Sequence, residues 1–331
     1  MSDYVYALFT SRNPWPISTG EVLDKLWRTL RGNWKLYLGL GAPMVVMGIA
    51  WVAVIFAVLF ATGVFPLHPG VQPDPLRILP WFFAVMVIGT IPNLVVYALY
   101  QAATVFATLR EASGQKTTVR EAYAAAWSRA GHYCWLMFLH YLCVAGPVML
   151  CGGLFGGAIF VLQIGHKTES PAMFLVFPLI FLVYMGALAY ALWMMLYLGM
   201  AFPASVAEKL PAVDALKRSA KLSYKAKGKL FLVLLVVYAI SYAAVFVLEI
   251  GGGIIFGLGA VLFAALHLGT ALGIAAGSVV GLVFLVLMYA YMALLWAAYS
   301  ITFTIVYCDQ RLRLDGPGAE PAAVAGGIVP A

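Results

Sequence analysis

Charge is scarce in this sequence and is missing from long blocks. Charged residues make up 10% of the 331-residue chain, whereas a soluble domain carries about 25%. No Asp, Glu, Lys or Arg occurs between Lys35 and Asp74, between Arg77 and Arg110, between Arg129 and Lys167, or between Glu169 and Glu208. About 20 apolar residues cross the hydrocarbon core of a bilayer. Blocks of this length therefore exclude a water-soluble core and predict membrane spans.

Cysteine is also rare, and known catalytic motifs are missing. The four cysteines, Cys134, Cys143, Cys151 and Cys308, include no CxxC pair, so we expect free thiols. The sequence has no HExxH, GxSxG or P-loop motif. No carboxylate lies at metal-ligand spacing from any of the five histidines. We therefore expect no catalytic residue, no cofactor and no metal site.

Apolar blocks are what the sequence does contain, near residues 36–64, 80–108, 133–162, 171–206, 230–250 and 279–307. They predict an all-α, polytopic membrane protein with six transmembrane helices. Region 251–281 is long enough for a seventh span, but that span would separate Arg311 and Arg313 from the other cations. We therefore favour an outer re-entrant or interfacial helix there. Its glycines recur every four residues, at Gly269, Gly273, Gly277 and Gly281, which favours close helix packing over an ion or substrate path.

The distribution of cations predicts the orientation. Of the 20 Lys and Arg residues, 18 lie before the first block, after the last block, or in loops 109–132 and 207–229. Arg77 and Lys167 are the other two. Because short basic loops stay in the cytoplasm, we expect a multi-pass protein of the inner (plasma) membrane with both termini cytoplasmic. We therefore expect the net charge of +7 to attract anionic lipid headgroups rather than nucleic acid.

Segments 18–34, 118–134 and 211–227 share one plan. The first two open with capping boxes, Ser18 with Glu21 and Thr118 with Glu121, and Pro211 holds the matching position in the third. Each is an amphipathic cytoplasmic helix followed by two spans, in units of about 18–108, 118–206 and 211–308. This predicts a threefold parallel repeat within one membrane domain, 18–316. Residues 1–17 precede it, and we expect residues 317–331 to be a disordered tail.

The third amphipathic segment carries candidate lipid contacts. Its apolar positions are Val213, Leu216, Ala220 and Tyr224, and its cations, Lys217, Arg218, Lys221 and Lys225, face roughly the other way. A helix lying among headgroups has this pattern. The four cations are therefore candidate contacts for anionic headgroups at the cytoplasmic face. The alternative, that they only set the topology, stays open.

Two stretches resemble a bacterial family. One runs from Glu208 through Ala215-Leu216-Lys217-Arg218-Ser219 to Gly228, and the other is Tyr307-Cys308-Asp309-Gln310-Arg311-Leu312-Arg313-Leu314-Asp315-Gly316. With GEVLDKLWRTLRGNWKLYLGL near the N-terminus, they are similar to the membrane domain fused to some bacterial glycerophosphodiester phosphodiesterases and to its stand-alone relatives of unknown function. Ala220 and Cys308 depart from the aromatic residues common in that family. The resemblance implies six spans and an inner-membrane location. It implies no phosphodiesterase activity, which resides in a separate soluble domain of the fused proteins.

Four polar residues lie inside the apolar blocks: Asn93, Gln101, His140 and Glu249. Glu249 is about 30 Å along a helix from Lys229, so we expect it near hydrated outer headgroups. Asn93 follows Pro92, and its amide is expected to satisfy the opened backbone rather than to face a substrate. Gln101 and His140 lie at matching depths, so we predict an interhelical hydrogen bond between them.

These features favour a non-enzymatic scaffold or lipid-interacting membrane domain. The alternative is a transporter or permease for a small or lipid-derived solute, which the repeat and the Pro92-Asn93 break would suit. A membrane-embedded enzyme is the least supported class, because no carboxylates or histidines cluster at one depth. Membrane lipids are the expected partner, and a homo-oligomer or a partner membrane protein stays open.

Overall fold

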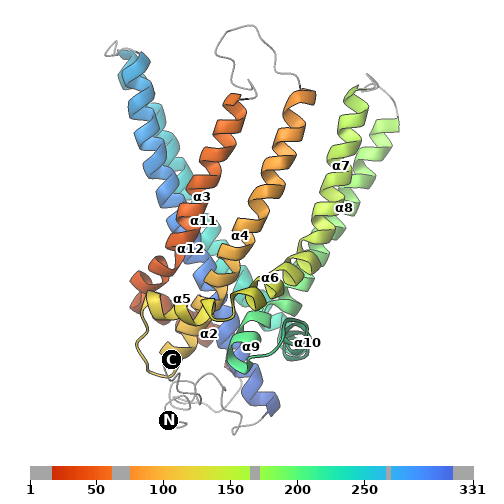
Figure 1. Ribbon diagram of the computed structural model, residues 1–331, viewed down its shortest axis with the longest axis vertical. Coiled ribbons are helices and arrows are strands. Elements are labelled where there is room, and N and C mark those ends of the chain that lie inside the picture. The colour runs from red at the N-terminus through yellow and green to blue at the C-terminus, as the bar shows by residue number, and fades with distance from the viewer. Residues whose placement is uncertain (1–16, 62–74, 165–171, 266–269, 316–331) are drawn as a thin grey trace.

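The long helices of the protein form three hairpins that diverge from a common end (Figure 1). A computed structural model of the chain describes residues 17–61, 75–164, 172–265 and 270–315. The helices there are α2 (Thr19–Gly32), α3 (Trp34–Ala61), α4 (Pro75–Ala112), α5 (Val119–Trp127), α6 (Ala130–Val144), α7 (Gly146–Ile164), α8 (Ala172–Leu198), α9 (Ala201–Glu208), α10 (Ala212–Ser223), α11 (Lys227–Ala265) and α12 (Thr270–Asp315). The hairpins are α3–α4, α7–α8 and α11–α12. The end that carries α2, α5, α9 and α10 is called the base. The predicted tail, 317–331, lies outside the described residues.

Within the described residues, five helices are long and apolar enough to cross a membrane, in the ranges Trp34–Ala61, Val87–Ala112, Pro178–Glu208, Lys227–Gly259 and Ala276–Asp315. A sixth span results if α6 and α7 cross together, since they meet at a 55° bend. The chain is therefore a helical, multi-pass membrane protein with five or six spans. The span predicted over 133–162 is thus bent where α6 meets α7. Pro147 has no N–H to donate to the carbonyl of Cys143, and its ring crowds that carbonyl, which breaks the helix near Ala145.

Region 251–281 is part of the last hairpin. Helix α11 continues to Ala265 and α12 begins at Thr270, so the outer re-entrant or interfacial helix favoured from the sequence is wrong. Isolated glycines cost a helix only about 1 kcal/mol each, and the apolar residues between them sustain both helices. A Cβ at Gly277 would meet nothing within 4 Å, so no helix among the described residues packs closely on that glycine.

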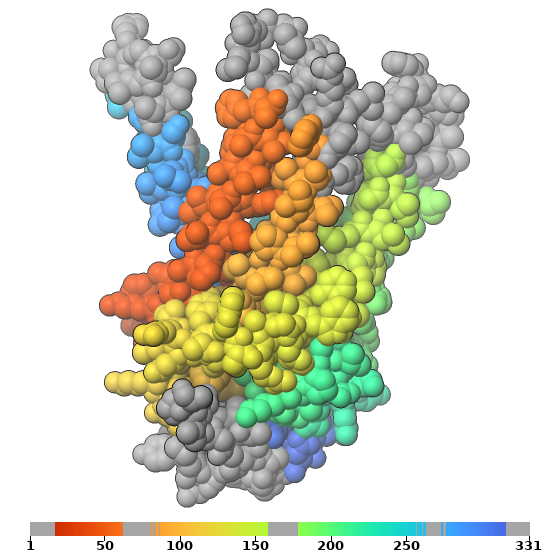
Figure 2. Space-filling model, in the orientation of Figure 1, coloured from red at the N-terminus to blue at the C-terminus, as the bar shows by residue number. Residues whose placement is uncertain are grey.

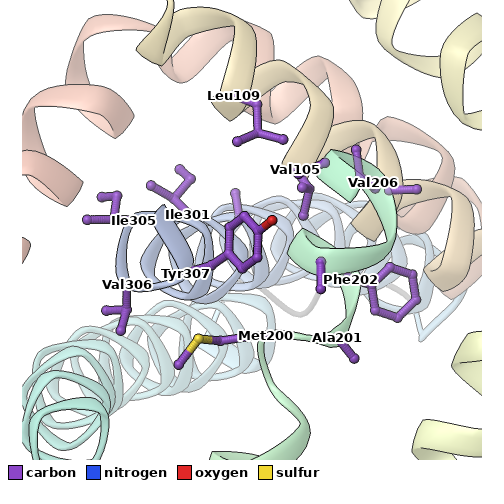
Figure 3. Close-up of a cluster of buried hydrophobic side chains, with 14 of the residues drawn as sticks. Val105, Leu109, Met200, Ala201, Phe202, Val206, Ile301, Ile305, Val306 and Tyr307 are labelled. Carbon is purple, nitrogen blue, oxygen red and sulfur yellow. The ribbon is translucent and has the colours of Figure 1, made fainter. Parts of the chain in front are cut away.

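The main cluster of buried side chains among the described residues lies toward the base. Figure 3 shows side chains of α4, α9 and α12 gathered around Tyr307, including Val105, Phe202 and Ile301. The helices separate toward the other end, as α3 and α12 do in Figure 2. There, each hairpin presents large apolar side chains outward, for example Ile88, Leu154 and Val247, each 68% exposed. Apolar side chains this exposed belong against lipid rather than water.

One close approach ties the first hairpin to the last. Gly41 of α3 is buried, and a Cβ at this position would lie 2.4 Å from the Cβ of Ala293 in α12. At the same residue of α12, Tyr100 of α4 donates its hydroxyl hydrogen to the carbonyl of Ala293 at 2.7 Å. The pair of small residues lets the backbones of α3 and α12 meet.

Candidate functional site at the base

Three amphipathic helices lie at the base, as the sequence predicted. In α2, the Ser18 side chain accepts from the Glu21 amide at 3.2 Å, and the Glu21 carboxylate accepts from the Ser18 amide at 2.6 Å. Thr118 and Glu121 form the same reciprocal pair at the start of α5. Both predicted capping boxes are thus confirmed. Pro211 precedes α10 in an extended conformation and makes no side-chain cap.

The packed face of α10 is not the apolar face. Its buried residues are mostly small: Ala212, Ala215, Ser219, Leu222 and Ser223. Val213 and Tyr224, which the sequence placed on the main apolar face, are 50% and 69% exposed. The small side chains let α10 approach α9 and α8, because they add little bulk between the helices. Val213 and Tyr224 are left facing outward.

Two serines of α10 close the break between α8 and α9. The Ser219 hydroxyl donates to the carbonyl of Tyr197 at 2.8 Å and accepts from the amide of Met200 at 3.1 Å. Ser223 also donates to the Tyr197 carbonyl, at 3.1 Å. Backbone groups that the turn at residues 199–200 leaves unpaired are satisfied in this way. The amphipathic helix α10 is therefore fastened to the end of a membrane span.

A cluster of charges joins α9, α10 and α12, and we call it the Glu208 cluster. Glu208, whose side chain is 16% exposed, accepts from the Tyr307 hydroxyl at 2.7 Å and from Arg218 Nε at 3.2 Å. Arg218 also contacts Asp315, and Arg311 Nε lies 3.8 Å from both carboxylates. Each charge has an opposite partner, which is what burial of ions requires.

Asp309 forms a second cluster beside the first. It is fully buried, and its Oδ2 atom accepts from Lys229 Nζ at 3.1 Å and from Gln310 Nε2 at 3.0 Å. Arg313 lies 3.3 Å from the same oxygen. Asp309 Oδ1 is buried and has no hydrogen-bond partner among the described residues. Lys229 lies in the first turn of α11, so this cluster holds the two helices of the last hairpin together.

The electrostatics of the Glu208 cluster keep Arg218 charged. Burial alone would lower the pKa of Arg218, but the hydrogen bond to Asp315 and the attraction of Glu208 outweigh it and raise that pKa. Arg218 is one of the four candidate headgroup contacts, and here it is paired with Glu208 and Asp315. Its guanidinium is held inward between two carboxylates because the small-residue face of α10 packs on the protein.

The other three candidate cations differ from Arg218 in their exposure. Lys217, Lys221 and Lys225 are all exposed at the base. None of the three makes an ion pair within the described part of the chain. They remain available to bind anions from outside the protein.

The candidate polar residues within the spans are scattered. The Asn93 amide donates to the Gly89 carbonyl, four residues earlier, at 2.9 Å, so it satisfies the backbone of its own helix near Pro92. Glu249 is exposed on α11. Neither points to a shared polar centre.

The predicted bond between Gln101 and His140 is not formed. Helices α4 and α6 pack against each other, but no hydrogen bond joins the two side chains in the described structure. His140 Nδ1 is buried and has no hydrogen-bond partner among the residues that the structure describes. The prediction rested on equal depth, which does not determine the rotation of each helix about its axis, and that rotation decides the contact.

No family model, no curated protein and no solved structure matches this chain. Within the described ranges, no three metal-ligating side chains gather into a metal site, and all four cysteines are free. The site at the base is therefore defined by its own geometry: paired charges inside, and lysines and aromatic residues outside.

The sequence analysis missed the roles of Glu208, Tyr307 and Asp309. One signal was available, since Tyr307, Arg311 and Asp315 recur every four residues and so share one face of a helix. Their partners come from a segment about 100 residues earlier, and helical spacing cannot reveal such a contact. The two stretches that carry the family resemblance are the ones that meet in the Glu208 cluster.

Proposed function

We propose that the protein is a six-span inner-membrane protein whose base binds anionic lipid headgroups, acting as a non-enzymatic scaffold or lipid-interacting domain. One observation carries this proposal: α10 exposes Lys217 and Lys221, and the turn after it exposes Lys225, beside the exposed apolar residues Val213 and Tyr224. A helix at headgroup depth gives both kinds of side chain a partner, phosphate for the lysines and acyl chains for the apolar residues.

The other two amphipathic helices support the same placement. Trp27 of α2 and Trp127 of α5 are 60% and 67% exposed, although tryptophan is a large and mostly buried residue in soluble proteins. Exposed tryptophans are typical of the membrane–water interface. Because α2, α5 and α10 each precede a hairpin, we also propose the threefold parallel repeat.

The orientation follows from the cations. All but two of the 20 Lys and Arg residues belong to the N-terminal segment, the C-terminal end or the loops that hold α5 and α10, and these are expected in the cytoplasm. Reporter fusions after residues 32, 120, 220 and 318 should report the cytoplasm. Fusions near residues 72 and 167 should report the outside. A fusion after residue 318 found outside would contradict the six-span proposal.

Transport of a small or lipid-derived solute is the weaker proposal. A transporter needs polar groups that face a path, whereas several buried polar side chains here bond to their own helices. Thr108, Thr302 and Thr304 each donate to the carbonyl four residues earlier at 2.8 Å. Asn93 does the same. Hydroxyls and amides used in this way support structure rather than a solute path.

Membership of the family of membrane domains fused to some bacterial glycerophosphodiester phosphodiesterases is also a proposal. It is supported by the contact between Arg218 in one resembling stretch and Asp315 in the other. Paired charges that both stretches supply give a physical reason for the two motifs to occur together in one chain.

Native mass spectrometry tests the lipid proposal. Purified protein titrated with phosphatidylglycerol and with phosphatidylcholine should prefer the anionic lipid. Each cation near an anionic surface contributes about 1 kcal/mol, so Lys217→Gln with Lys221→Gln should weaken phosphatidylglycerol binding by about thirtyfold. The matched control, Lys116→Gln with Arg120→Gln, removes two exposed cations from the base outside α10. An equal effect in the control would remove the special role of α10, and no preference between the lipids would contradict the proposal.

A further inference from the structure

Three aromatic rings surround the ammonium of Lys227 at the base. Lys227 Nζ lies 3.6 Å from the ring centre of Tyr197, 4.4 Å from that of Trp193 and 5.2 Å from that of Tyr224. Trp193 and Tyr197 stand one turn apart on α8 with ring centres 5.9 Å apart, and Lys227 opens α11. Three separate segments thus build one cation-holding site, which we call the Lys227 box.

The Lys227 box leaves its cation without an ionic partner. Ring faces attract an ammonium when it lies within about 6 Å of their centres, so all three contacts are favourable. No carboxylate lies within 4.0 Å of Lys227 in the described part of the chain. Lys229, two residues later, is paired with Asp309. An ammonium has three N–H donors and ring faces carry no formal negative charge, so an anion from outside the protein can complete the site.

The surroundings of the box indicate which anion. Trp193 and Tyr224 are 53% and 69% exposed, as expected of aromatic residues at a membrane interface. Lys221 and Lys225, exposed in the preceding turn and helix, add positive charge beside the box. The first residue of a membrane span therefore carries a fixed cation at the level where phosphates of lipids lie.

We propose that the Lys227 box binds the phosphate oxyanion of an anionic phospholipid, with the rings holding the ammonium and its open N–H groups donating to the phosphate. The inference rests on the proposed lipid-binding function and names its tightest site. A cationic headgroup is excluded from the box, because Lys227 already fills it and would repel a second cation. A water-soluble phosphate ester shares the recognised chemistry, so the experiment must separate the two sources.

Single variants test the site by native mass spectrometry with phosphatidylglycerol as the probe. Lys227→Gln should weaken the first bound lipid by about thirtyfold, since it removes a hydrogen-bonded charge. Lys217→Gln removes one exposed cation of α10 and should cost about fivefold or less. Lys227→Arg keeps the charge and stacks on rings, so it should restore most of the binding and show that the site is folded. Equal losses in Lys227→Gln and Lys217→Gln would overturn the site while leaving general lipid binding intact.

Matched tryptophan variants test the rings. Trp193→Leu should weaken the first lipid by about threefold through the lost cation–π contact. Trp135→Leu is the control, because Trp135 is also 53% exposed but stacks on Phe138 with no cation over it. Loss of binding in both variants, or in neither, would overturn the role of the box.

Competition separates the two phosphate sources. Glycerol 3-phosphate at millimolar concentration should leave the first phosphatidylglycerol bound, because it lacks the acyl chains that hold a lipid against α8 and α11. Displacement of the lipid by glycerol 3-phosphate would overturn the assignment to a lipid. If wild-type protein shows no preference for phosphatidylglycerol over phosphatidylcholine, the proposed function itself fails, which is a different outcome from failure of the box.

Discussion

Tyr307 of α12 donates its hydroxyl hydrogen to Glu208 at the end of α9, at 2.7 Å. The two residues are 99 positions apart in sequence, and Tyr307 is fully buried. The bond therefore connects the last membrane helix to the segment that leads into α10. Because Glu208 also binds Arg218, the position of α10 depends on the same carboxylate.

Removal of the Tyr307 hydroxyl should weaken the base. A hydrogen bond to a charged group contributes about 1.5–3 kcal/mol, so we expect Tyr307→Phe to lower the free energy of unfolding by that amount. Unfolding in detergent by a chemical denaturant measures the change. The matched control is Tyr242→Phe on α11, where the tyrosine is 63% exposed and its hydroxyl makes no hydrogen bond within the described structure. Equal stability of the two variants would contradict the role of this bond.

Local features of this fold were predictable and long-range ones were not. The capping boxes depend on residues three positions apart, so the sequence contains all of the information. The same holds for the apolar blocks, which became the long helices. The Glu208 cluster depends on how α9, α10 and α12 pack, and the spacing of residues within each helix does not determine that.

The packing of α10 illustrates a second limit. Helical periodicity places Val213, Leu216 and Tyr224 on one apolar face, but it cannot say whether that face meets protein or lipid. In a membrane protein both environments are apolar, so small residues such as Ala215 and Ser219 mark the protein-facing side instead. The break near Pro147 also could not be predicted, because a proline in an apolar block has no single structural outcome. Prolines at 43 and 178 lie inside unbroken helices, so proline alone does not predict a break.

The start of α2 should depend on pH through Glu21. Its carboxylate accepts the backbone hydrogen bond of Ser18, which lowers the pKa of Glu21 below the ordinary value of 4.5. A lowered folded-state pKa stabilises the helix start above pH 4.5, and this contribution is lost as the pH falls through the folded-state pKa. We expect the rate of backbone amide hydrogen exchange in residues 18–22, corrected for its intrinsic pH dependence, to increase as the pH falls through the folded-state pKa of Glu21. The Glu21→Gln variant retains an acceptor but does not titrate, so its exchange protection should show no such step.

The contact between Gly41 and Ala293 should tolerate no added methyl group. A Cβ at Gly41 would lie 2.4 Å from the Ala293 Cβ, and neither atom sits on a flexible side chain that can move aside. We expect Gly41→Ala to lower the free energy of unfolding by about 1–3 kcal/mol, the usual cost of overpacking. Gly131→Ala in α6 is the control, since a Cβ there meets nothing within 4 Å, and it should stabilise the helix by about 0.5–1 kcal/mol. A neutral Gly41→Ala would show that α3 and α12 are not held in contact.

His140 should be dispensable for stability. Its Nδ1 atom is buried without a hydrogen-bond partner, and a buried polar atom without a partner costs about 1–3 kcal/mol. Leucine has a similar size and no polar atom, so His140→Leu should leave the thermal midpoint unchanged or raise it. Because no bond joins His140 to Gln101 in the described structure, the effects of His140→Leu and Gln101→Leu should add within about 0.5 kcal/mol. A double-mutant cycle in detergent measures this directly. Coupling near the 0.6 kcal/mol or more that is typical of interhelical hydrogen bonds in membranes would instead support the contact predicted from equal depth, and would require α4 or α6 to rotate about its axis.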